Sequence, residues 1–90
     1  MAVPEHYDAI RNSVFFDPEF YLSANADVRA SGTDPSLHYL LQGGAEGRDP
    51  SRAFSTRGYL ARNPDVAEAD MNALLHYELY GRHEKRRLFD

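Results

Sequence analysis

The sequence predicts an all-α domain, in which a leading helix precedes two tandem repeats of about 38 residues with three short helices each. Two observations predict this fold: most of the chain is written twice at a fixed spacing, and helix-start signals recur in both copies. No stretch alternates apolar and polar residues long enough to indicate a strand, which supports the same fold class. The predicted divisions of this single compact domain are residues 1–14, 15–53 and 54–90.

The two copies are 38 residues apart, and 13 positions agree without a gap between residues 16–48 and 54–86. The identical pairs are Phe16 and Phe54, Tyr21 and Tyr59, Leu22 and Leu60, Asn25 and Asn63, Asp27 and Asp65, Val28 and Val66, Leu37 and Leu75, His38 and His76, Tyr39 and Tyr77, Leu41 and Leu79, Gly43 and Gly81, Glu46 and Glu84, and Arg48 and Arg86. A fixed period of this size indicates a structural unit repeated along the chain. We therefore expect the shared polar residues to be parts of a duplicated scaffold.

The leading helix is predicted over residues 4–13, outside the repeat. Pro4 suits a first helical position, because proline has no amide to leave unsatisfied there. Tyr7, Ile10 and Val14 follow at a helical spacing and would form its apolar face.

Each repeat shows three helix starts and one stop. Asp17 and Asp34 stand directly before a proline, as N-caps do, and Asn25 is predicted to cap the helix between them. Gly43 and Gly44 are predicted to end the third helix, since glycine readily takes the left-handed conformation that follows a helix terminus.

Composition excludes several classes of function. The net charge of −4 argues against a general nucleic-acid binder, and the chain contains no cysteine for a disulfide or a zinc–thiolate site. No segment approaches the length of a membrane span, so no membrane insertion is predicted. The N-terminus has no apolar run of a secretory signal, so we expect a cytoplasmic protein or a part of an exported particle.

The combined motif is Phe-Asp-Pro-Glu-Phe-Tyr-Leu, then Asn-x-Asp-Val, His-Tyr-x-Leu-x-Gly and Glu-Gly-Arg-x-Pro. Over residues 15–90 it resembles a bacterial helical repeat of the form FDxxYYLxxNPDVxxAGxxPxxHYxxxGxxEGRxP. Such units occur beside glycosyltransferase domains of surface-polysaccharide synthesis and in large exported or surface proteins. The resemblance implies an accessory or interaction module near bacterial polysaccharide, and it supplies no catalytic residues.

The second copy departs from this pattern at several positions. Asp17 and Pro18 become Ser55 and Thr56, Gly32 becomes Asp70, Pro35 becomes Ala73, and Gly47 becomes Lys85. We expect a looser helix start and a changed turn in this copy, as terminal repeats often show.

His38 and His76, which match at the repeat spacing and are each followed by tyrosine, are the strongest candidates for chemistry. A metal or acid–base site could combine them with nearby acids. The simpler interpretation is structural, with each ring satisfied by a carboxylate or carbonyl of the neighbouring short helix. The predicted structural motif residues are Asn25, Asp27, His38, Tyr39, Asn63, Asp65, His76 and Tyr77.

A second set of residues is predicted to contact a ligand or partner: Phe20, Glu46, Arg48, Tyr80, Arg82, Lys85, Arg86 and Arg87. The basic members could bind an anion or could complement a helix end. Glu46 and Arg48 could present charge to a sugar or could pair across the repeat boundary. Aromatic rings can stack on sugars, but those at repeated positions are expected to fill the core.

The predicted function is a non-enzymatic binding or adaptor module associated with bacterial surface polysaccharide, capsular or exopolysaccharide, with no cofactor and no metal. The alternative is a structural adaptor or spike-base subunit of a larger assembly such as a phage-like particle. The expected partners are another protein subunit, polysaccharide or both, and oligomers are compatible with either function. No nucleic-acid partner is predicted.

Overall fold

The computed structural model describes residues 5–86, and these residues form helices and turns without a strand. The helical fold class predicted from the sequence is confirmed. The molecule measures 35 × 28 × 23 Å, with a Cα radius of gyration of 12.4 Å. No helix within residues 5–86 has the length and hydropathy needed to span a membrane.

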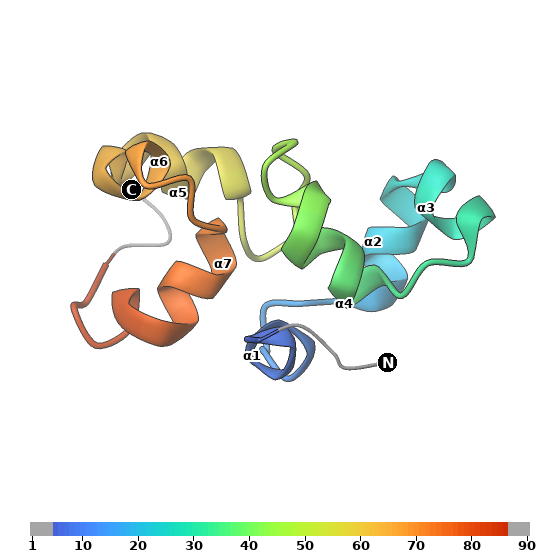
Figure 1. Cartoon of the computed structure of the whole chain (residues 1–90), viewed down its shortest axis with the longest axis horizontal. Coiled ribbons are helices and arrows are strands. Elements are labelled where there is room, and N and C mark those ends of the chain that lie inside the picture. Colours follow the sequence, from blue (N-terminus) through green and yellow to red (C-terminus); the bar gives the residue numbers. More distant parts are fainter. Residues whose placement is uncertain (1–4, 87–90) are drawn as a thin grey trace.

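Figure 1 shows the order of the elements along the chain. They are α1 (Tyr7–Arg11), α2 (Pro18–Ala24), α3 (Ala26–Ser31), α4 (Pro35–His38), η1 (Tyr39–Gly43), α5 (Thr56–Arg62), α6 (Pro64–Glu68), α7 (Ala73–His76) and η2 (Tyr77–Gly81), where η marks a π-helix. From α2 to η1 and from α5 to η2 the elements follow in the same order. We call residues 16–48 the N-terminal half and residues 54–86 the C-terminal half.

The leading helix α1 is shorter than predicted and packs beneath the centre of the molecule (Figure 1). It contacts α4 of the N-terminal half and both α7 and η2 of the C-terminal half. Ile10 is fully buried in these contacts, whereas Val14 is 83% exposed. The prediction that Val14 belongs to the apolar face was wrong, because the helix ends at Arg11 and the chain turns away. Pro4 lies outside the described residues.

Two of the three predicted N-caps in the N-terminal half are confirmed. The Asp17 carboxylate accepts a hydrogen bond from the Phe20 amide at 3.0 Å, and Asp34 caps α4 in the same manner. The prediction for Asn25 was wrong, since its side chain makes no cap hydrogen bond to α3. Asn25 instead donates to the Tyr21 carbonyl at 2.8 Å, at the corner between α2 and α3.

The C-terminal half does not have the looser helix start that the sequence predicted. Ser55 accepts from the Gly58 amide at 2.9 Å, and so caps α5 as Asp17 caps α2. Asn72 caps α7 by accepting from the Leu75 amide at 3.0 Å.

The turn after each third helix differs from the predicted glycine stop. Gly44 is not left-handed, with φ −61°, and its amide donates to the Tyr39 carbonyl five residues earlier at 2.9 Å. The left-handed residue is Gly47, with φ 80°. Lys85 takes the same conformation at the matching position, with φ 58°. The predicted change of turn in the second copy was therefore also wrong, because a non-glycine residue adopts the same backbone there.

The core is built on three aromatic rings in each half, as the repeat positions predicted. Phe16, Tyr21 and Tyr39 are buried in the N-terminal half, and Tyr21 and Tyr39 meet edge to face with ring centroids 5.9 Å apart. The matching rings Phe54, Tyr59 and Tyr77 form the same cluster in the C-terminal half. Phe15, which precedes Phe16 in the chain, packs on the cluster of the C-terminal half, with its ring centroid 6.2 Å from that of Phe54 and 5.7 Å from that of Tyr77.

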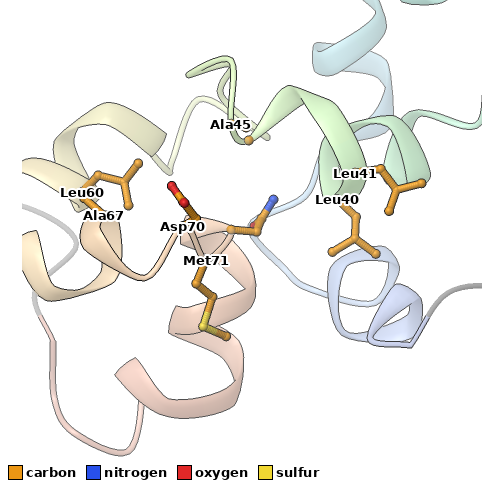
Figure 2. A pocket seen from close by; sticks show the side chains of 9 residues that line it. Leu40, Leu41, Ala45, Leu60, Ala67, Asp70 and Met71 are labelled. Carbon is orange, nitrogen blue, oxygen red and sulfur yellow. The ribbon is translucent and has the colours of Figure 1, made fainter.

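The halves meet beside an open groove of about 290 Å³. Figure 2 shows Leu40 and Leu41 of η1 on one side and Leu60 and Ala67 of α5 and α6 on the other, with Met71 between them.

Candidate functional site

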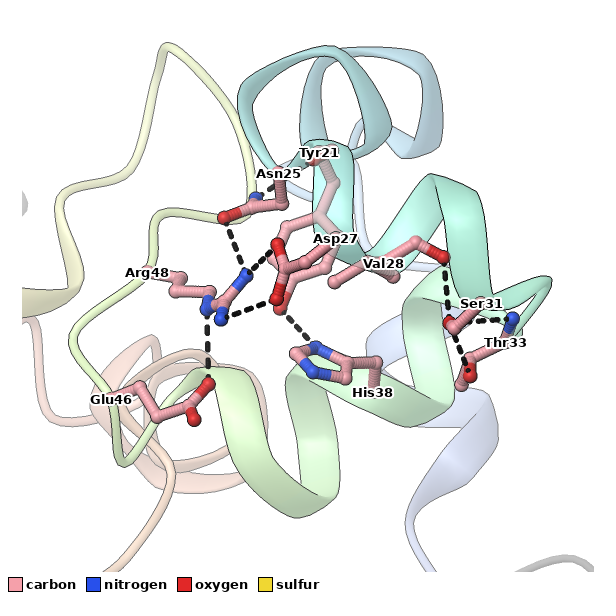
Figure 3. Close-up of polar contacts among 9 residues, drawn as sticks. All are labelled: Tyr21, Asn25, Asp27, Val28, Ser31, Thr33, His38, Glu46 and Arg48. Atoms are coloured by element: carbon pink, nitrogen blue, oxygen red, sulfur yellow. Dashed lines mark hydrogen bonds and ion pairs between the residues drawn. The ribbon is translucent and has the colours of Figure 1, made fainter.

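Three of the predicted motif residues of the N-terminal half, Asn25, Asp27 and His38, come together around a tyrosine–histidine pair (Figure 3). The fourth, Tyr39, lies outside this group, with its hydroxyl bonded to Thr56. The Tyr21 hydroxyl, from α2, and His38 Nδ1, from α4, are joined by a hydrogen bond of 2.7 Å. The sequence had predicted a carboxylate or a carbonyl as the hydrogen-bond partner of each histidine. That prediction was wrong, because the partner is a tyrosine hydroxyl. The residue it missed had a usable signal, because Tyr21 and Tyr59 are among the identical pairs and each stands 17 residues before its histidine.

An arginine fork closes the site from the other side (Figure 3). The Arg48 guanidinium donates to both carboxylate oxygens of Asp27 at 2.9 Å, to Asn25 Oδ1 at 2.9 Å and, through Nε, to Glu46 at 3.0 Å. A bidentate arginine–carboxylate pair fixes orientation as well as distance. Pairing across the repeat boundary, one of the two roles predicted for Glu46 and Arg48, was wrong, since their side-chain contacts stay within one half. We call the six residues Tyr21, Asn25, Asp27, His38, Glu46 and Arg48 the polar cluster.

The C-terminal half repeats this cluster contact by contact. Tyr59 and His76 are joined at 2.8 Å, and Arg86 donates to both oxygens of Asp65 at 3.1–3.2 Å. The remaining contacts, from Arg86 to Asn63, from Arg86 to Glu84 and from Asn63 to the Tyr59 carbonyl, are also present. Each cluster ties the corner between its first two helices to the turn after its π-helix.

Both clusters require a glycine at the end of the π-helix. A Cβ on Gly43 would lie 1.9 Å from the Tyr21 hydroxyl oxygen, and one on Gly81 would lie 2.3 Å from that of Tyr59. Glycine at these two positions therefore leaves the space in which the tyrosine hydroxyl reaches its histidine.

The electrostatics of the cluster favour fixed protonation states. Burial raises the pKa of Tyr21 and of Tyr59 to about 12, so both phenols keep their protons at neutral pH. The Arg48 hydrogen bond lowers the pKa of Asp27 to about 2. Burial, with the nearby Arg86 charge, lowers the pKa of His76. A general acid or base works best with a pKa near the working pH, which the two phenols do not have.

The buried polar groups of the cluster all have hydrogen-bond partners. Among residues 5–86, no buried side-chain nitrogen or oxygen lacks a hydrogen-bond partner. Within the same part of the chain, no three His, Asp or Glu side chains are grouped as ligands of a metal ion. Chemically, the arrangement holds helices together.

The residues predicted to contact a ligand or partner are dispersed. Phe20 is half-buried, with the Arg52 guanidinium 5.2 Å above its ring. Tyr80 is 52% exposed, and its ring centroid lies 5.6 Å from that of His76. Arg82 pairs with Glu78, whereas Glu46, Arg48 and Arg86 belong to the polar clusters. Lys85 is exposed in its turn, and Arg87 lies outside the described residues.

The groove between the halves is a second candidate that the sequence did not reveal. Its walls come from elements far apart in the chain: Leu40, Leu41, Gly44, Ala45, Leu60, Ala67, Asp70, Met71 and Asn72. The Asn72 side chain crosses between the halves and donates to the Tyr39 carbonyl at 3.1 Å. The sequence could at most have indicated that two similar units meet. Where a groove lies at their junction depends on how the units pack.

Models of known protein families do not match this chain, and searches of characterised proteins and of solved structures find no match either.

Proposed function

We propose that the two halves are tandem copies of one helical unit, and that the protein is a non-enzymatic binding and adaptor module associated with bacterial surface polysaccharide. The observation that carries the proposal is the pair of matching polar clusters. Side chains that resemble catalytic residues in the sequence bind one another there, in the same geometry twice. This use of the motif residues supports a scaffold whose binding function lies on its surface.

Replacing the histidines separates a scaffold from an enzyme. We expect His38→Gln and His76→Gln to lower the free energy of unfolding and to leave binding by the folded protein intact. A variant that folds normally and loses a defined turnover would overturn the non-enzymatic function.

The polysaccharide association is supported by the family resemblance and by the exposed ring of Tyr80, which is followed in the sequence by the basic residues Arg82 and Lys85. An exposed ring offers a flat apolar face of the kind that sugars stack on. Affinity electrophoresis in gels containing capsular polysaccharide tests it, with retarded migration as the expected result. Tyr80→Ala should abolish the retardation, and Val14→Ala, which also trims an exposed apolar residue, should not. Unretarded migration of the unaltered protein would count against this association.

A structural subunit of a larger assembly is the second candidate, and the exposed apolar groove favours it. Leu41, which lines the groove, is 57% exposed. Exposed apolar patches on a protein surface often mark sites of interaction with another protein. Native mass spectrometry of the protein purified from its own cells tests it. Recovery of a defined complex supports an assembly subunit, and a strict monomer argues against one.

A further inference from the structure

The groove between the halves has the chemistry of a site for an apolar side chain. Its side walls are aliphatic, from Leu40, Leu41, Leu60, Ala67 and Met71, and no aromatic ring lines it. Its volume of about 290 Å³ lies at the lower limit of pockets that bury a small ligand, roughly 300 Å³. A sugar, which stacks best on aromatic faces, is a poor fit to such walls. An aliphatic side chain from a polypeptide fits them well.

One end of the groove carries negative charge that no described residue neutralises. Asp70 lines the groove and Glu68 stands two residues before it, both exposed, and neither forms an ion pair with any residue from 5 to 86. The helix α6 ends at Glu68 without a basic residue in its last turn, so its carbonyl ends add negative potential. Figure 2 shows the Asp70 carboxylate beside Leu60 and directed away from the Met71 side chain. A cation beside an apolar anchor would complement this end.

We propose that the groove binds a segment of a partner protein that presents one or two leucine-sized side chains next to a lysine or arginine. This inference deepens the adaptor function proposed above and rests on it. The aliphatic walls take the apolar side chain, and Asp70 with Glu68 takes the cation. The overall charge of −4 adds long-range attraction for a basic segment.

The test is a two-dimensional amide NMR titration of the labelled full chain with the peptide acetyl-Gly-Lys-Leu-Leu-Lys-Gly-amide. The expected result is a set of shifts at the amides of Leu41, Ala45 and Met71 at millimolar peptide or below. The matched peptide with Glu in place of both Lys should bind about two- to fivefold more weakly, as expected for one exposed charge contact. Maltohexaose should leave these amides unmoved.

Three variants locate the binding. Asp70→Asn should reduce the preference for the lysine peptide, because it removes one of the two charges that contact the cation. Asparagine also tolerates the left-handed conformation of this residue, φ 56°. Leu41→Ser should weaken both peptides about tenfold, through the lost apolar contact. Val14→Ser, which changes an exposed apolar residue outside the groove lining, should leave binding unchanged.

Three outcomes would overturn the inference: no groove shifts with the lysine peptide, equal binding of both peptides, or groove shifts with maltohexaose. Self-association that Leu41→Ser abolishes and Val14→Ser does not would assign the groove to a second copy and would also overturn it. A chain that fails these titrations and is still retarded by polysaccharide, or still purifies in a complex, removes only this inference and leaves the proposed function standing.

Discussion

The two halves agree in their polar clusters and differ where each π-helix ends. In the N-terminal half, Gly44 lies so close to the other half that a Cβ would come within 2.3 Å of Asn72 Nδ2. The matching residue of the C-terminal half is Arg82, whose guanidinium lies 5.5 Å from the centre of the Tyr77 ring and pairs with Glu78 at 2.6 Å. Residues in the polar clusters are the same in both halves because the side-chain hydrogen bonds of each cluster stay within its own half. Gly44 and Arg82 differ because their surroundings differ: Gly44 packs against the other half, whereas Arg82 makes its contacts within its own half.

The tyrosines before these positions show the same difference. The Tyr39 hydroxyl is fully buried and bonded to Thr56 Oγ1 at 2.9 Å, and Thr56 in turn donates to the Arg48 carbonyl at 2.7 Å. This chain of two hydrogen bonds links the halves. Tyr77 is only half-buried, and its hydroxyl has no hydrogen bond to any residue from 5 to 86.

Exchanging the residues at the ends of the π-helices should give the largest effect. Gly44→Arg should destabilise the protein by about 1–3 kcal/mol, because the new side chain must displace Asn72 from the junction. Arg82→Gly should cost at most about 1 kcal/mol, through the lost surface ion pair and the greater backbone freedom of glycine. Urea unfolding measures both. Equal losses would show that the two ends are packed alike.

Exchanging the left-handed turn residues should give the next largest effect, with opposite signs in the two halves. Gly47→Lys should destabilise by about 1–2 kcal/mol, because only glycine takes this conformation without cost, and the Arg57 side chain lies in the way. Lys85→Gly should stabilise by about 0.5–1 kcal/mol, the relief of that cost less the entropy of glycine. Thermal unfolding of the two variants beside the parent protein decides, and a loss of stability in Lys85→Gly would contradict the argument.

Removing the hydroxyl of Tyr39 or of Tyr77 should have a smaller effect on stability. Tyr39→Phe should cost about 1 kcal/mol, because it removes a buried hydrogen bond between the halves. Tyr77→Phe should change stability by no more than about 0.5 kcal/mol, as for an ordinary surface change. Chemical denaturation of both variants under one set of conditions is the measurement. A cost at Tyr77 equal to that at Tyr39 would mean that its hydroxyl has a partner of similar strength.

Much of this fold could be predicted because its signals are local or repeated. Asp17 and Asp34 cap helices through amides two or three residues away, and the buried rings recur at the repeat spacing. The agreement at this spacing extends beyond the 13 pairs, since Ser13 and Ser51 are also 38 residues apart and each accepts from the amide two residues on.

The failures arose where a distant residue decided between two local choices. Asn25 could cap α3 or brace the corner before it, and Arg48, 23 residues away, holds its oxygen in the second role. Lys85 could have changed its turn, but the turn still leads Arg86 back to its fork with Asp65 and so keeps the left-handed backbone. The partners of the histidines and the groove between the halves likewise depend on how the helices pack.

The smallest effects concern acid, where the two polar clusters should behave alike. The folded state holds the pKa of Asp27 at about 2 and that of Asp65 below the ordinary 3.8, because each carboxylate accepts hydrogen bonds from an arginine. Unfolded carboxylates bind protons first as the pH falls, so this stability is present above pH 3.8 and is lost between about 3.8 and 2. Both carboxylates are exposed, so solvent screens the interaction and keeps the loss small.

His76 adds a shallow slope at higher pH that the carboxylates cannot produce. Burial lowers its pKa in the fold, so below about pH 6.5 the unfolded chain takes up more protons and stability falls with the pH. Unfolding free energies measured from pH 7.5 down to pH 2.5 show both slopes. His76→Gln should remove the pH dependence of the unfolding free energy just below pH 6.5. Asp27→Asn and Asp65→Asn should each reduce the pH dependence between about pH 3.8 and 2.5, and by a similar amount. A much larger effect of Asp27→Asn than of Asp65→Asn would mean that the two clusters, though alike in their contacts, do not hold their halves with equal strength.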